Sequence, residues 1–319
     1  MDNINVLGID LAKDVFQLCG LSHSNNVTFN KAVRRCNLLG AVLQHSGATV
    51  AMEACGSAHH WARLFESHGF EVVLVPAQFV KGFTRGNKND AKDALAIAES
   101  ALRPELHPVQ MKSLEQQDYQ TLLRYRSRQI ELQVSTSNQT RGILAEYGVV
   151  FPKSNAAFTR SVPDLLADGD NGLTPIVRNT IHALFSEFLL YQERITNLDK
   201  ELAQIVRLHP TIRSLTRLRG IGPITAIALF ASIGNGHHFK NGRQLSAWIG
   251  LVPKQFGTGG NTRLGEISKR GNQYLRTLLI HGARTVMNWV KEKTDGFSLW
   301  TKQLVARRGK HKAIVAIAN

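Results

Sequence analysis

The sequence predicts an α/β domain at the amino terminus and a mostly helical remainder. Short apolar runs of strand length alternate with helical patterns over about the first 100 residues, whereas long polar helical patterns dominate the rest. Three strands in succession, followed by alternating helices and strands, indicate a mixed sheet covered by helices. We expect three parts, spanning residues 1–106, 107–207 and 208–319.

The first strands occupy the opening residues. The stretch 4–20, INVLGIDLAKDVFQLCG, predicts two strands joined by a tight connection, with Asp10 at the end of the first. Residues 27–33 predict a third strand, so that the three strands form an antiparallel meander.

Helices and buried strands alternate after this meander. Residues 38–45 predict a short helix before ATVAMEAC, a buried strand with Glu53 near its carboxyl end. HHWARLFESHG predicts a second helix, and FEVVLVPA predicts another buried strand. In such sheets ligands gather at the carboxyl ends of the strands, which is where Asp10 and Glu53 lie.

A pair of acids opens the next predicted helix. NKNDAKDALAIAES, residues 87–100, places Asp90 and Asp93 three residues apart, so that they share one helix face. Two like charges on one face cost free energy unless a cation lies between them, and the stretch does not match a calcium-binding loop.

Four carboxylates from separate elements suit a two-metal phosphoryl-transfer site. Hard oxygen ligands hold Mg²⁺ or Mn²⁺, and two such ions flank the attacking and leaving oxygens of a phosphodiester. Each acid also has a structural interpretation, with Asp10 as a strand-end cap and Asp90 as a helix N-cap. The joint placement favours the metal hypothesis, with these ligands: Asp10, Glu53, Asp90 and Asp93.

Two long helices are predicted in the middle of the chain. They cover residues 113–147 and 175–208, and the pattern breaks over 152–170. Apolar residues of the second helix advance in alternating steps of three and four, which is a heptad seam: Ile181, Leu184, Phe188, Tyr191, Ile195, Leu198, Leu202 and Ile205. A coiled-coil hairpin or dimer arm and an ordinary helical spacer both remain open.

A glycine turn and a basic glycine-rich stretch follow. Gly220 and Gly222 lie between two predicted helices and resemble a helix–hairpin–helix element, which holds nucleic-acid backbone through its N–H groups. Residues 246–276 do not match the G-x-x-x-x-G-K-[ST] phosphate loop, which disfavours nucleotide hydrolysis. We expect a flexible loop there that contacts a sugar–phosphate backbone through five basic residues: Lys254, Arg263, Lys269, Arg270 and Arg276.

The overall charge indicates a polyanionic partner. The 319 residues carry a formal net charge of +15 with a pI near 10.0, and 20% of them are charged. Three cysteines without metal-ligand spacing predict buried free thiols in a reducing cytoplasm. We expect neither a signal peptide nor a membrane span.

Several motifs together resemble one family. They occur in this order: GIDLAKD, MEACGS, NKNDAKDA, LRGIGPITA, AWIGLVPKQ, GTGGNTRLGEISKRG and YLRTLLIHGAR. This series resembles the bacterial insertion-sequence transposases with an Asp-Glu-Asp-Asp motif, a family that includes the Piv site-specific DNA invertases. The resemblance covers nearly the whole chain.

The resemblance implies a fold and a set of partners. It implies a RuvC-like (ribonuclease-H-like) amino-terminal domain, a helical coiled-coil middle and a carboxyl-terminal transposase domain. It also implies that the four acids bind two Mg²⁺ or Mn²⁺ ions. Members are similar to recombinases that use a structured non-coding guide RNA, often called a bridge RNA, to pair with donor and target double-stranded DNA. Such a protein would be cytoplasmic and associated with the nucleoid when acting.

The resemblance further implies a nucleophilic serine in the glycine-rich part of the carboxyl domain. This sequence departs from that pattern, because Thr258 stands where the serine is expected. A threonine hydroxyl can attack phosphorus, although its extra methyl group restricts its rotamers. Ser268 is the alternative nucleophile.

The favoured hypothesis is a DNA transposase or recombinase that cleaves and rejoins strands. We expect a composite active site and an oligomer, either a dimer or a dimer of dimers. One alternative is a RuvC-like junction or structure-specific nuclease that uses water as its nucleophile. A second alternative is a non-catalytic RNA- or DNA-binding protein with structural acids.

Overall fold

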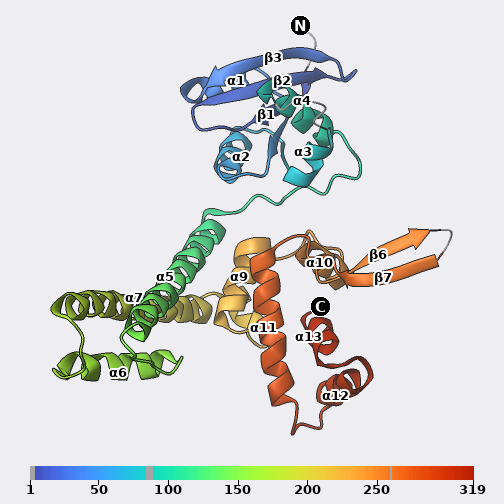
Figure 1. The fold of residues 1–319 in the computed structure, drawn as a ribbon. Helices are drawn as coiled ribbons and strands as arrows, with labels where there is room; N and C mark the ends of the chain where they lie inside the picture. The colour runs from blue at the N-terminus through green and yellow to red at the C-terminus, as the bar shows by residue number, and fades with distance from the viewer. Residues whose placement is uncertain (1–3, 84–88, 259–260) are drawn as a thin grey trace. The chain divides into compact units, whose positions relative to one another are not determined.

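The computed structural model describes residues 4–83, 89–258 and 261–319. The chain divides into two compact units, Met1–Ser113 and Leu114–Asn319 (Figure 1). The prediction of an α/β part followed by a mostly helical part is confirmed.

A five-stranded mixed sheet forms the centre of the first unit. Its spatial order is β3-β2-β1-β4-β5. β1 pairs antiparallel with β2, which pairs antiparallel with β3, whereas β4 and β5 extend the sheet in parallel from β1. The predicted antiparallel meander of three strands is therefore confirmed. The five strands of the sheet are β1 (Ile4–Asp10), β2 (Val15–Ser22), β3 (Val27–Arg34), β4 (Thr49–Glu53) and β5 (Val72–Val75).

Helices cover both faces of this sheet. α1 (Leu38–Leu43), preceded by a 3₁₀ turn at Arg35–Asn37, and α2 (Ala58–Ser67) pack on one face. α3 (Ala77–Phe83) and α4 (Asp90–Ala101) pack on the other face. Alternation along β1 explains both cores, because Leu7 and Ile9 face the first pair of helices and Val6 faces the second.

The two edges of the sheet differ in how they are covered. β3 is an exposed edge strand that carries Lys31 and Arg34. At the other edge, the N–H of Val109 donates to the carbonyl of Leu74 over 2.8 Å, so the segment after α4 covers β5.

Three helices begin the second unit. α5 (Leu114–Ala145) packs against α7 (Pro175–Leu208) of the same chain, and α6 (Asn155–Ala167) lies between them in sequence. The predicted break over 152–170 is wrong for most of its length. Ser154 caps α6 by accepting from the N–H of Ala157, and burial of Phe158 holds the helix against its neighbours although it contains a proline.

The rest of the second unit combines helices with one hairpin. The elements are α8 (Pro210–Leu215), α9 (Pro223–Ile233), α10 (Gly242–Ile249), β6 (Pro253–Thr258), β7 (Asn261–Ile267), α11 (Gln273–Trp289), α12 (Gly296–Arg308) and α13 (Lys310–Ala318). The glycine-rich stretch predicted as a flexible loop is thus largely an antiparallel β-hairpin, which extends away from the helices of its unit in Figure 1. Cross-strand hydrogen bonds satisfy backbone groups that a loop would leave to water.

The cysteines only partly match their prediction. All three are free thiols, but Cys36 and Cys55 are exposed, because both lie just beyond the ends of strands. Cys19 is buried, and burial together with the nearby Glu99 carboxylate raises the pKa of its thiol to about 11. None of the helices within the described residues is long and apolar enough to cross a membrane.

Candidate metal site and nucleic-acid surface

Two of the predicted acids end neighbouring parallel strands. Asp10 is the last residue of β1 and Glu53 is the last residue of β4. Because Ile9 pairs with Met52 across the two strands, Asp10 and Glu53 occupy the next matching positions. Asp10 follows Val6 by four residues and Glu53 follows Ala51 by two, and Val6 and Ala51 both face α3 and α4, so the two acids lie on the α4 face of the sheet.

The other two acids lie at the start of α4, directly above β1. A Cβ atom placed on Gly8 would lie 2.4 Å from the carbonyl oxygen of Ala94 and 2.7 Å from the Cβ of Ala98. Only glycine allows this approach, which brings the first turns of α4 onto the strand that ends in Asp10. Asp90 is exposed, whereas Asp93 is buried.

The N-cap of α4 is Asn89. Its Oδ1 accepts from the N–H groups of Ala91 over 2.8 Å and Lys92 over 3.4 Å. The alternative role of Asp90 as N-cap is therefore wrong, since Asp90 is the first helical residue. Its carboxylate lies in the first turn, where the helix dipole favours negative charge.

A chain of hydrogen bonds links β2 and β3 to α4 and was not predicted. Gln17 pairs with Asp10 across the antiparallel strands, and its Nε2 donates to Asn30 Oδ1 over 2.6 Å. Asn30 Nδ2 donates in turn to the carbonyl of Ala91 over 2.7 Å. Polar residues at positions of β2 and β3 that face the same side as Asp10 were the available sequence signal.

The donor chemistry fits hard divalent cations, because β1, β4 and α4 carry four carboxylates on the same side of the sheet. Within the described residues, however, no three or more His, Cys, Asp or Glu side chains lie close enough together to hold a metal ion. The fold therefore brings the three elements together without gathering the four carboxylates into a closed metal cage.

The predicted glycine turn connects α8 to α9. Gly220 has φ of +86°, and its carbonyl oxygen would lie 2.0 Å from a Cβ on Gly282 in α11, so the turn packs backbone to backbone on that helix. Gly222 is the exposed N-cap of α9, and no side chain from the described residues caps this end. This end of α9 can accept a phosphate.

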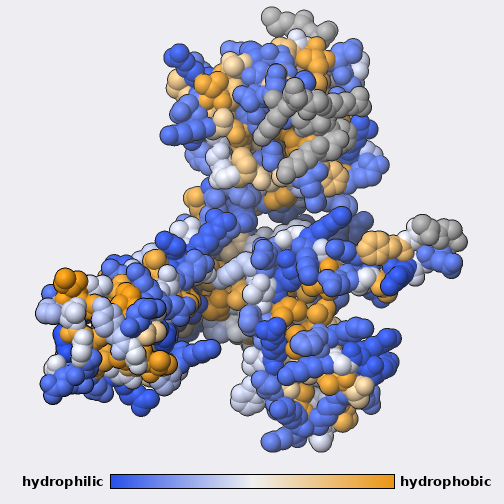
Figure 2. Space-filling model, viewed as in Figure 1, coloured by the Kyte–Doolittle hydropathy of each residue, from blue (hydrophilic) through white to orange (hydrophobic). Residues whose placement is uncertain are grey.

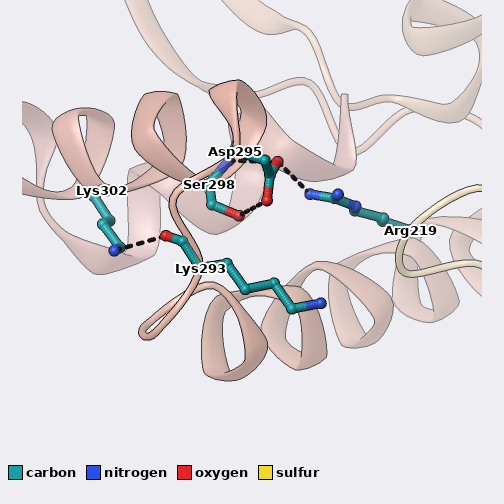
Figure 3. Close-up of polar contacts among 5 residues, drawn as sticks. All are labelled: Arg219, Lys293, Asp295, Ser298 and Lys302. Carbon is teal, nitrogen blue, oxygen red and sulfur yellow. Dashed lines mark hydrogen bonds and ion pairs between the residues drawn. The ribbon is translucent and has the colours of Figure 1, made fainter.

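An ion pair fixes this turn to the start of α12 (Figure 3). Arg219 Nη1 donates to Asp295 Oδ1 over 2.7 Å, and Asp295 also accepts from the N–H and Oγ of Ser298. The hydrogen bonds from Arg219 and Ser298 hold the pKa of the Asp295 carboxyl well below its usual range. The Arg219 guanidinium also lies 5.4 Å from the centre of the Phe297 ring.

The hairpin displays two of the predicted basic residues. Lys254 on β6 and Arg263 on β7 are exposed, and Arg263 lies opposite Phe256, which is 60% exposed. Thr258 ends β6 and its backbone pairs with Asn261, while its side chain is outside the described part of the structure.

The alternative nucleophile occupies a different environment. The Ser268 N–H donates to the carbonyl of Val252 over 2.7 Å. Its Oγ is buried and has no hydrogen-bond partner among the described residues. A buried hydroxyl at the base of the hairpin is poorly placed to attack a phosphodiester.

The remaining predicted basic residues differ in their contacts. Lys269 Nζ lies 3.3 Å from Glu266 Oε2, and both side chains are well exposed. Arg270 is exposed, and its backbone packs against Gly250. Arg276 instead donates from Nη1 to the carbonyl of Ile249 over 2.7 Å, which holds α10 to α11. Hydrophilic residues predominate on the face of the molecule that Figure 2 shows.

Two family models of transposases match this chain. A family model of the DEDD, IS110 type, described as a transposase, matches residues 7–149. A second model, described as the transposase IS116/IS110/IS902 family, matches residues 212–297.

Individual relatives match this chain over nearly its whole length. The transposase for insertion sequence element IS1111A of Coxiella burnetii is 43% identical over 319 residues, covering 100% of this chain and 88% of that protein. A probable family 20 transposase of Pseudomonas aeruginosa is 41% identical over 318 residues, covering 99% of this chain and 94% of that protein. A pilin gene-inverting protein of Moraxella bovis is 22% identical over 329 residues, covering 98% of this chain and 91% of that protein.

Proposed function

The chain belongs to the IS116/IS110/IS902 family of transposases, and we propose that it cleaves and rejoins donor and target DNA under the guidance of a structured non-coding RNA. It is a DNA transposase by family. The observation that carries the mechanism is the placement of Asp10 and Glu53 at neighbouring strand ends beneath the acidic start of α4.

We propose that the acids Asp10, Glu53, Asp90 and Asp93 hold two divalent cations. Membership of the DEDD family implies dependence on a divalent metal, and the oxygen-only donor set favours Mg²⁺ or Mn²⁺ over softer ions. Bound cations would stabilise the charge that develops on the phosphodiester oxygens and offset the repulsion among the carboxylates. The hydrogen bonds of Gln17 and Asn30 hold β2 and β3, which pair with β1 in the same sheet, to the start of α4.

We propose Thr258 as the nucleophile and residues 208–319 as the domain that carries it. Attack by its hydroxyl oxygen on phosphorus would join the protein to one DNA end and release the other end as a hydroxyl. The middle region, 107–207, would be the helical arm, and 1–106 the metal-binding domain. Because recombination handles several strands at once, a dimer or a dimer of dimers is the proposed working form.

RNA guidance is supported by charge and by the kind of contacts available. A net charge of +15 suits two nucleic acids at once. The exposed basic residues and the glycine turn of the second unit suit backbone contacts, which carry no sequence information. Sequence choice would then come from base pairing by the RNA.

The test begins with purification of the protein from its host and sequencing of the RNA that accompanies it. We expect one discrete structured RNA encoded beside the gene. That RNA, donor DNA, target DNA and Mg²⁺ should then reconstitute strand exchange with the purified protein. Recovery of bulk cellular RNA alone, together with strand exchange that needs no RNA, would overturn the proposal of RNA guidance.

A further inference from the structure

A hollow of about 380 Å³ lies in the second unit between α5, α9 and the first turn of α11. Its floor consists of buried apolar side chains, Leu123 from α5 and Ala228 and Ala231 from α9. The two alanines leave room between the helices because their side chains stop at Cβ. The volume is within the range of small-ligand pockets, roughly 300–1,000 Å³, and is too small for a duplex.

The walls of this hollow are cationic and aromatic. Arg124 and Arg128 lie one turn apart on α5 and both are exposed. Tyr274, which is 40% exposed, stands on the opposite side in the first turn of α11. Ser127 and Glu131 add a hydroxyl and a carboxylate to the α5 wall, and Glu131 lies 4.0 Å from Arg128.

Hydrogen bonds hold the walls in place. Asn272 caps α11 by accepting from the N–H of Leu275, and its Nδ2 lies 3.4 Å from Ser232 Oγ on α9. Gln116 Nε2 on α5 donates to the carbonyl of Phe230 at the far end of α9 over 3.0 Å. The hollow is therefore preformed, which lowers the entropic cost of filling it.

From these groups we infer that the hollow binds one unpaired nucleotide of the bound nucleic acid. A base can stack on the Tyr274 ring above the alanine floor, and the two guanidinium groups can hold the adjacent phosphates. The Ser127 hydroxyl and the Glu131 carboxylate offer the hydrogen-bonding groups that a base edge needs. A paired base could not enter, because its faces are covered by its stacked neighbours.

This inference deepens the proposed function, since it assigns a role to unpaired segments of the RNA or DNA partner. The experiment uses the full-length protein and short single-stranded oligonucleotides with one photoreactive base, 4-thiouridine in the RNA and 4-thiothymidine in the DNA. We expect crosslinks that map to the peptide containing Tyr274. The oligonucleotide that crosslinks there with the higher yield, RNA or DNA, identifies the nucleic acid that enters the hollow. Crosslinks that avoid the peptides of α5, α9 and α11 in both arms would overturn the inference.

Matched variants give a quantitative readout. Tyr274→Ala should weaken binding of single-stranded oligonucleotides about 5- to 150-fold, the loss expected when one base no longer stacks on a ring, and Tyr274→Phe should restore most of it. Tyr125→Ala is the control, because Tyr125 is a tyrosine of similar exposure on α5 that does not line the hollow. Equal affinities for Tyr274→Ala and Tyr125→Ala would contradict the inference.

A second pair of variants covers the case in which Tyr274→Ala does not fold. Arg124→Ala should weaken single-strand binding more than Arg194→Ala, which removes an exposed arginine from α7. Intact single-strand binding without strand exchange would count against the proposed function alone. Strand exchange that survives Tyr274→Ala with unchanged oligonucleotide affinity would count against the nucleotide site alone.

Discussion

The backbone of Gly8 in β1 lies against the backbone of Ala94 in α4, so close that a Cβ atom on the glycine would lie 2.4 Å from the alanine carbonyl oxygen. This approach, with that of Ala98 to the same glycine, lets α4 lie close to the sheet. It therefore also brings the helix that carries Asp90 and Asp93 close to the strand that ends in Asp10. The geometry of the proposed metal site depends on a residue that has no side chain.

Gly8→Ala should destabilise the first unit and impair activity. The added methyl group collides with backbone atoms that cannot rotate away, which costs about 1–3 kcal/mol or more in free energy of unfolding. Thermal unfolding of the variant checks this. Gly40→Ala is the control, because a Cβ there meets no atom within 4 Å and alanine favours the α1 helix. Equal melting temperatures for both variants would show that α4 does not pack as described.

Asp10→Asn and Asp93→Asn should each abolish strand cleavage without unfolding the protein. Loss of a direct metal ligand should reduce activity at least as much as loss of a supporting residue, which costs about 10- to 100-fold. EDTA should have the same effect, reversed by Mg²⁺ or Mn²⁺. Asp14→Asn, an exposed acid in the turn after β1, should keep full activity. Cleavage by Asp10→Asn at the wild-type rate would refute the metal assignment.

Thr258→Ala should remove the covalent protein–DNA adduct, because no hydroxyl remains to attack phosphorus. Thr258→Ser should retain the adduct, and it should form faster because the methyl group no longer restricts the rotamer. Denaturing electrophoresis of reactions with end-labelled DNA detects the adduct. Persistence of the adduct in Thr258→Ala would point to another hydroxyl and would disprove this role of Thr258.

Lys254→Ala and Arg263→Ala should weaken DNA binding in a salt-dependent manner. Each exposed charge that neutralises one phosphate adds about 1 to the slope of log K against log salt concentration, so each variant should lower the slope by that amount. Arg276→Ala should instead lower the melting temperature, because its guanidinium holds the Ile249 carbonyl. Binding isotherms at several salt concentrations separate the two effects, and an unchanged slope for Arg263→Ala would exclude a phosphate contact.

The Arg219–Asp295 pair should stabilise the second unit most at neutral pH. The pKa of Asp295 is lower in the folded state, so its contribution is present above the unfolded pKa, about 4, and is lost as the pH falls further toward the folded pKa. Asp295→Asn keeps a good N-cap but removes the charge. Its melting temperature should therefore lie slightly below that of the wild type at pH 7 and converge with it below about pH 4. A constant difference across this range would contradict the linkage.

The local elements were predictable because their signals are local. Apolar runs of strand length in the first 77 residues predicted all five strands of the sheet, and the spacing of Asp90 and Asp93 predicted one helix face. The contact from Asn30 to Ala91 was not predictable, because it joins residues 61 positions apart and depends on the pairing of β2 with β3.

The hairpin and α6 were missed for a related reason. Glycines in and around β6 and β7 are typical of loops, and only the cross-strand pairing of residues such as Phe256 and Arg263 produces strands. The proline within α6 suggested a break, but burial of Phe158 and Val162 outweighs the local propensity. Tertiary contacts decided both segments.

The charged edge strand β3 also bears on how the protein behaves when many copies crowd onto one nucleic acid. An unpaired strand edge is a template on which a second sheet can grow, and such growth leads to aggregation. Lys31 and Arg34 on β3 repel the same edge of another copy, and the segment around Val109 already occupies the opposite edge at β5. Polymerisation through the strand edges is thereby disfavoured at both edges of the sheet, β3 and β5, which leaves the copies free to associate through other surfaces.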